Sequence, residues 1–272
     1  MSFTPIMPTG GYAGWKFLQR TLEKQQTAYA ASGPIQRDDA QFRARIGQIR
    51  TAEDLVSDRG LLRVALGAFG LDADIDNRFF IRKVLEEGTL DEGSLANRLS
   101  DKRYRDFSKA FGFGDYSTPR TVLSDFSDEI LSRYRAMQFE ASVGEVDADM
   151  RLALATQREL PLLAAQDSKE TTKWYSIIGS PSLSLAFQKA LGLPASIGAL
   201  DIDQQVAAYQ KKAQTAFGTS DPAIFADPAR TEGFVRQMLL RSEIATLQTQ
   251  SRATIALQLL QGIGSRTLSV RM

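Results

Sequence analysis

Apolar residues recur at alternating spacings of three and four along most of this chain, and this period limits its possible folds more than any other feature. The stripe of Trp15, Leu18, Leu22, Gln25 and Tyr29 is the first clear case. It is apolar at every position but Gln25, and it gives a helix one apolar face. The alternating β-branched pattern of strands is almost absent, and the chain has no Asn-Gly or Asp-Gly hairpin turn. The sequence therefore predicts an all-α fold, a multi-helix bundle whose long N- and C-terminal helices pack together.

Glycine and proline divide the helical pattern into segments. We expect a flexible tail over 1–11, a first helical unit over 12–120 and a connecting helical segment over 121–172. A second helical unit with a long C-terminal helix comes next, over 173–264, and residues 265–272 form a tail.

Two long helices are predicted after the first unit. One covers 121–157, with Gly144 as the candidate interruption. The other begins near Thr231 and meets no proline before Gly262. Its last part is apolar on several sides, so it needs a partner, either the body of this protein or another subunit.

Part of the second half of the chain resembles part of the first. Leu61–Leu71 aligns with Leu183–Leu193, and both segments end in an apolar residue, a glycine and a leucine. The same comparison, with eight extra residues in the second copy, sets three residues against three others: Asp91, Leu95 and Tyr104 against Asp221, Phe225 and Phe234. A duplication predicts two similar helical units, and chance similarity between amphipathic helices is the alternative.

Composition removes several kinds of chemistry. The chain contains no histidine and no cysteine, which excludes histidine acid–base catalysis, cysteine nucleophiles and disulfides. Paired carboxylates remain, as in a glycosidase, and no pair is distinguished. The 33 basic and 32 acidic residues give a net charge of +1, without the basic footprint of a nucleic-acid-binding protein. We therefore predict no catalytic residue, no cofactor, no metal, no nucleic-acid partner and no membrane insertion.

One acidic segment has the opening spacing of a calcium-binding loop. Asp72, Asp74 and Asp76 alternate as the first ligands of an EF-hand do. Asn77 then replaces the turn glycine, and Lys83 stands where the bidentate glutamate is required. We read the segment as an acidic helix start.

Three segments carry a resemblance to a known family: Asp54-Leu-Val-Ser-Asp-Arg-Gly-Leu-Leu62, Ala68-Phe-Gly-Leu71 and Ser94-Leu-Ala-Asn-Arg-Leu-Ser-Asp-Lys-Arg-Tyr104. Together they resemble the bacterial family called domain of unknown function 1217, whose members occur mainly in alphaproteobacteria, often beside flagellar genes. The resemblance extends over about residues 12 to 250. It implies a link to the flagellum and brings no catalytic residues.

The two ends of the chain are similar to a second group. Leu18–Gly33 resembles the N-terminal helix of flagellin-like axial proteins, and Ser251–Gly262 is similar in pattern to their C-terminal helix. In those proteins the terminal helices pair as a coiled coil and assemble with neighbouring subunits. Here Gln25 and Ser251 occupy seam-like positions, and no heptad pattern is sustained.

These observations favour a non-enzymatic structural or assembly component associated with the bacterial flagellum, acting through helix-mediated protein–protein interaction. The alternatives are a cytoplasmic adaptor or chaperone for flagellar export and a carboxylate-based hydrolase. Expected partners are flagellar or export-apparatus proteins, with self-association as a further option. The expected location is the flagellum or the cytoplasm, because no cleavable signal peptide is apparent. The residues expected to make the contacts are apolar positions of the two terminal helices: Trp15, Leu18, Leu22, Tyr29, Leu240, Ile244, Leu247, Ile255 and Leu259.

Overall fold

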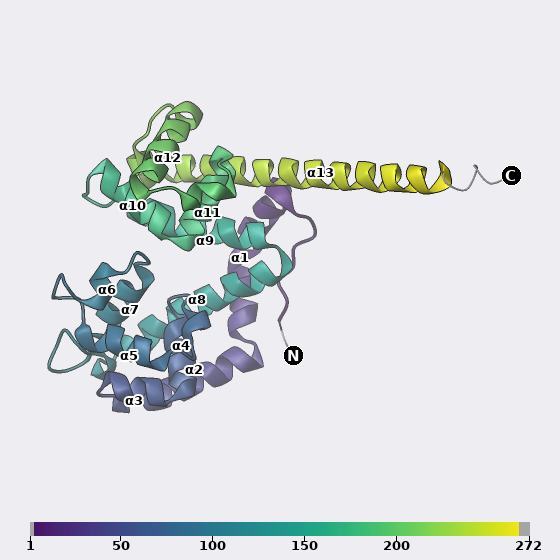
Figure 1. The fold of residues 1–272 in the computed structure, drawn as a ribbon. Helices are drawn as coiled ribbons and strands as arrows, with labels where there is room; N and C mark the ends of the chain where they lie inside the picture. Colours follow the sequence, from purple (N-terminus) through teal and green to yellow (C-terminus); the bar gives the residue numbers. More distant parts are fainter. Residues whose placement is uncertain (1–2, 267–272) are drawn as a thin grey trace.

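The structure, a computed structural model, describes the backbone of residues 3–266 and the side chains of residues 3–248. Over that backbone the chain forms helices joined by short connections and contains no strand, so the predicted all-α fold is confirmed (Figure 1). The helices form two groups. The first unit comprises α2 (Gly33–Arg45), α3 (Ala52–Ser57), α4 (Arg59–Gly67), α5 (Arg78–Glu87), α6 (Leu95–Arg98), α7 (Arg103–Phe111) and α8 (Phe126–Val146). The second comprises α9 (Ala148–Ala164), α10 (Glu170–Gly179), α11 (Pro181–Leu191), α12 (Ile202–Phe217) and α13 (Pro228–Arg266).

Helix α1 (Gly11–Ala30) lies outside both units and contacts α8, α9 and α13. Residues 3–10 precede it and pack back along it, which corrects the expectation of a free tail. The backbone N–H of Ile6 donates to Gln25 Oε1 at 2.8 Å, and Gln25 Nε2 donates to the Ile6 carbonyl at 3.0 Å. The ring of Phe3 packs against Tyr29 and Phe139. A buried glutamine thus holds the segment by pairing with its backbone.

Two hydrophobic cores lie on either side of α8, and this helix contributes to both. Ile130 and Tyr134 in its first half join the core of the first unit. Phe139 and Val143 in its second half join the core of the second unit, where α1 also inserts Trp15. Because one continuous helix serves both cores, α8 couples the two units mechanically.

The two units repeat one arrangement of helices. In the first, α4 packs against α2, α3 and α8, and α5 packs against α3. In the second, α11 packs against α9, α10 and α13, and α12 packs against α10. The structure therefore pairs α4 with α11, as the aligned segments predicted, and it pairs α8 with α13.

Matching glycines fix the register of this repeat. Gly70 and Gly192 follow the two aligned helices in the left-handed conformation, with φ of 67° and 64°. In each case the next leucine closes the helix end: the N–H of Leu71 donates to Leu66 at 3.0 Å, and that of Leu193 donates to Gln188 at 2.9 Å.

The long helices α8 and α13 also occupy equivalent positions relative to these two glycines. A Cβ on Gly70 would meet Met137 of α8, and a Cβ on Gly192 would meet Arg241 of α13. Position 137 of α8 therefore corresponds to position 241 of α13. The further match of Tyr104 with Phe234 is wrong, since Tyr104 lies in α7 and Phe234 in α13.

The predicted helix over 121–157 is divided at Asp147, three residues after Gly144. The Asp147 side chain accepts from the N–H groups of Asp149 and Met150, at 2.9 and 3.1 Å, and so caps α9. The chain reverses there, because Gly144 faces Arg151 and Glu140 pairs with Arg158. Helix α9 therefore runs antiparallel to the second half of α8.

Helix α13 contains 39 residues, which corresponds to a length of about 58 Å. Its first turns pack on the second unit, and the remainder extends away from the rest of the protein as a single helix (Figure 1). Ser242 is the last buried residue among the described side chains. We call residues 243–266 the α13 arm.

Candidate interaction surface

The terminal helices contact each other within one chain, and four of the hydrogen bonds between them converge on one carboxylate. Glu232 of α13 accepts four hydrogen bonds from α1: Tyr12 Oη at 3.1 Å, Trp15 Nε1 at 3.2 Å, Lys16 Nζ at 3.0 Å and Gln19 Nε2 at 3.0 Å. Partial burial alone would raise the pKa of Glu232, but the hydrogen bonds from α1 outweigh it and leave the pKa below its usual value. The charged carboxylate is therefore the form that holds α1 on α13.

The residues of the predicted α1 stripe are all buried or half-buried inside the protein. Trp15 and Leu18 are fully buried in the second core. Leu22 and Tyr29 are half-buried and pack against the same core, where burial raises the pKa of Tyr29 to about 12. The inward face of α13 that belongs to this core carries Val235, Met238 and Leu239.

The predicted α13 residues have a different environment. Leu240 is 40% exposed, Ile244 is 54% exposed and Leu247 is 58% exposed. The structure does not bring them against the α1 stripe, because they lie on the face of α13 that turns away from the core. The side chains of Ile255 and Leu259 lie outside the described residues.

A groove runs beside these exposed positions, between the end of α11 and α13. Its volume is 810 Å³. The apolar side chains that line it are Leu185, Leu193, Pro194, Ala195, Ile244 and Ala245. We call it the α13 groove. Leu185 is 46% exposed there, so apolar surface continues from α13 onto α11.

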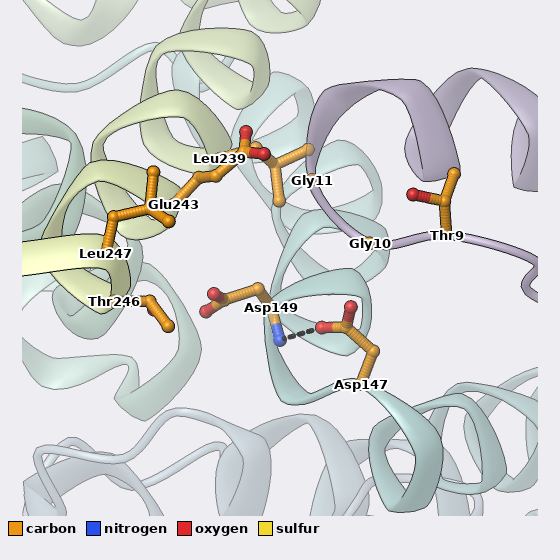
Figure 2. Close-up of a pocket in the computed structure, with 9 residues that line it drawn as sticks. All are labelled: Thr9, Gly10, Gly11, Asp147, Asp149, Leu239, Glu243, Thr246 and Leu247. Atoms are coloured by element: carbon orange, nitrogen blue, oxygen red, sulfur yellow. Dashed lines mark hydrogen bonds between the residues drawn. The ribbon is translucent and has the colours of Figure 1, made fainter. Parts of the chain in front are cut away.

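A smaller acidic pocket of 320 Å³ lies on another side of α13, against the start of α1 (Figure 2). Its carboxylates come from Asp147, Asp149 and Glu243. Asp147 caps α9, and Asp149 accepts from Lys189 at 2.6 Å and from Ser242 at 2.5 Å. These contacts give Asp147 and Asp149 structural roles. Among the described residues, no group of three or more acidic side chains is placed to hold a metal ion.

The acidic segment at 72–76 likewise does not form one site. Asp72 accepts from Gln138 at 2.7 Å, and Asp76 pairs with Arg59 at 2.7 Å. The third carboxylate, that of Asp74, accepts from Tyr104 Oη at 2.5 Å. The three side chains have separate partners. Asp72 and Asp74 lie in a short 3₁₀ helix ahead of α5, and the first turn of α5 contains no acidic residue.

Sequence reasoning missed a buried ion pair where the two units join. Glu140 of α8 is almost fully buried and pairs with Arg158 of α9 at 3.1 Å. Burial raises the pKa of Glu140, and Arg158 offsets only part of that rise. No sequence signal marks this pair, because both positions read as ordinary charged positions of amphipathic helices.

The arrangement defines an all-α protein of two similar units that carries a long, partly uncovered terminal helix. The chain belongs to the family described as Protein of unknown function (DUF1217), whose profile matches residues 68–230. Its fold is similar to an X-ray crystal structure of protein AGR_C_984 from Agrobacterium tumefaciens, a structural-genomics target. The TM-score is 0.71 at 22% identity, over 89% of this chain and 99% of that one. No curated protein matches the chain.

The comparison with the Agrobacterium protein supports the fold alone. No helix in the described part of the chain is both long and apolar enough to cross a membrane.

Proposed function

We propose that this protein is a non-enzymatic structural or assembly component associated with the bacterial flagellum, and that it works by helix-mediated contact with other proteins. The observation that carries the proposal is the position of Leu240 and Ile244. Both side chains are exposed on α13, at the point where this helix leaves the body and beside an apolar groove.

The energetic argument concerns apolar area. Full burial of a leucine or isoleucine side chain stabilises a complex by about 1.5–3 kcal/mol. Leu240, Ile244 and Leu247 recur at helical spacing, so a single partner helix covers all three at once. Ile244 also lines the α13 groove together with Leu185 of α11, so apolar surface continues from Ile244 onto α11.

The flagellar assignment has a different support. It rests on the family, whose members the sequence resemblance associates with flagellar genes. The partners we propose are therefore flagellar or export-apparatus proteins, and the location is the flagellum or the cytoplasm.

Deletion of the gene in its own host tests this proposal. We expect reduced swimming motility, restored by the wild-type chain and by Leu162→Glu, which changes an exposed leucine of α9 in the same way. Ile244→Glu is expected not to restore motility, because it places a charge on the contact surface. A deletion strain that swims normally would contradict the proposal.

Fractionation of the same strains separates an axial component from the export adaptor. A structural part is expected in the flagellar fraction. A protein confined to the cytoplasm that copurifies with export proteins would identify the adaptor, which uses the same surface.

A further inference from the structure

The internal repeat shows what kind of element covers the surface that α13 leaves open. Because position 137 of α8 corresponds to position 241 of α13, Glu140 corresponds to Ile244 and Val143 to Leu247. Glu140 and Val143 are 6% and 0% exposed. The corresponding positions of α13 are 54% and 58% exposed.

In the first unit this covering is supplied by a helix that folds back. The second half of α8 is covered by α9, which runs antiparallel to it, and by α1. No helix among the described elements comes after α13 in that role. Helices α2 through α12 are already packed in the two units, and α1 is packed against α8, α9 and α13. Another molecule can supply the equivalent antiparallel helix.

We infer that this helix is α13 of a second copy of the chain, and that two copies associate through an antiparallel pair of α13 helices. This inference rests on the proposed function, in that it takes the exposed face of α13 as a contact surface.

Length and position favour a second copy as the occupant. The arm, residues 243–266, is a backbone helix about 36 Å long. It is longer than α9, which covers α8 with 17 residues, about 26 Å. The groove and the arm adjoin on one molecule. If two copies are related by a two-fold axis near Ile244, the arm of each copy lies along α13 of the other copy and over the α13 groove of that copy. A single symmetric contact then covers both grooves.

Sedimentation of the purified full chain tests the inference without any other protein. We expect a concentration-dependent species of twice the 30.0 kDa chain mass. Ile244→Glu on α13 and Leu185→Glu on α11 are each expected to return the mass to that of one chain at the same concentration. The second variant reports on the groove separately from α13. Leu162→Glu is the matched control and should leave the dimer unchanged, and circular dichroism checks that each variant is folded.

Crosslinking tests the orientation, and the absence of native cysteine makes each introduced thiol unique. In an antiparallel pair, Ile244→Cys crosslinks to itself, and Leu240→Cys crosslinks to Gln248→Cys when the two variants are mixed. Equal self-crosslinking at positions 240, 244 and 248 would instead indicate a parallel pair and overturn the arrangement.

A wild-type chain that stays monomeric at every accessible concentration overturns the inference. If Ile244→Glu still abolishes motility in that case, the surface serves a different protein and the proposed function stands. A dimer that dissociates as expected, from a gene whose deletion leaves motility intact, supports the inference while the flagellar proposal fails.

Discussion

The second half of α8 and the beginning of the α13 arm occupy equivalent positions in two copies of one helical arrangement, but their surroundings differ. The first is enclosed by α9 and α1, and it carries Phe139 and Val143 in a core. The second carries Ile244 at an exposed position beside a groove. Both helices begin by packing on their own unit in the same way. Within the described residues, a helix that folds back over its predecessor follows α8 but not α13.

This comparison separates two uses of one sequence pattern. An apolar face on α8 stabilises the monomer, because a covering helix is part of the same chain. The same kind of face on α13 adds little to the monomer and is available to a partner. Substitutions in the covered part of α8 and in the exposed part of α13 should therefore differ in their effect on stability.

The largest effect on stability is expected from removal of the buried ring of Phe139 in α8. Phe139→Ala leaves a cavity among Phe139's neighbours Phe3 and Tyr29, and it should lower the free energy of unfolding by about 3–5 kcal/mol. Ile244→Ala, in dilute protein, should change it by no more than about 0.5 kcal/mol. Urea denaturation followed by circular dichroism measures both values, and similar costs at the two sites would contradict the comparison.

The next effect concerns the junction of the terminal helices. Glu232→Ala removes the acceptor of the buried Trp15 indole and of three further donors, and it should cost about 1–3 kcal/mol. Faster hydrogen exchange is expected over 11–19, because α1 loses its attachment to α13. The control is Gln248→Ala, an exposed polar residue of the same helix on the side of the α13 groove, which should leave exchange in α1 slow.

Acid should reveal the same contact. The pKa of Glu232 is lower in the folded chain, so the stability that its charge supplies is present above the unfolded value of about 4.3 and is lost as the pH falls through the folded pKa. Wild type should therefore lose more stability than Glu232→Gln on acidification. Equal losses would mean that the carboxylate charge does not hold α1.

Helical periodicity was enough to predict the all-α fold. Trp15 and Leu18 were identified as apolar positions of one helix face, and the structure buries both. The same periodicity identified Leu240 and Ile244, but a period does not state what covers a face. The sequence therefore identified these residues as apolar helix positions without distinguishing core from surface.

The polar contacts could not be predicted from the sequence, for a related reason. Glu232 and Glu140 look like solvated charges in the sequence, and only the tertiary arrangement brings donors or burial to them. The expected free tail failed similarly, since the pairing of Ile6 with Gln25 joins residues 19 positions apart. Contacts between polar groups that are far apart in the chain produce no periodic pattern in the sequence.

A smaller effect tests the register of the repeat. Gly70→Ala and Gly192→Ala should each cost about 1 kcal/mol, because both glycines adopt left-handed backbone and the atoms they would meet end flexible side chains. Gly233→Ala in α13 is the control: no atom lies within 4 Å of the added methyl group, so it should stabilise the helix by about 0.5–1 kcal/mol. Unequal costs at Gly70 and Gly192 would show that the two helix ends are not equivalent.

The smallest effect is a change in pH dependence at the equivalent positions 140 and 244. Burial raises the pKa of Glu140, so the folded chain holds this proton more tightly than the unfolded chain does. Its stabilising contribution is full below the unfolded pKa of about 4.3 and is lost as the pH rises through the folded pKa. Glu140→Gln does not titrate, so its stability relative to wild type should increase across that rise.

Urea unfolding at a series of pH values measures this difference, with Ile244→Gln as the control. Position 244 is exposed and carries no titrating group, so that variant should keep the pH dependence of wild type. If wild type instead gained stability relative to Glu140→Gln as the pH rose, attraction between Glu140 and Arg158 would exceed the cost of burying the charge. The ion pair would then be a net source of cohesion between α8 and α9, and the covering of α8 would depend on charge as well as on apolar contact.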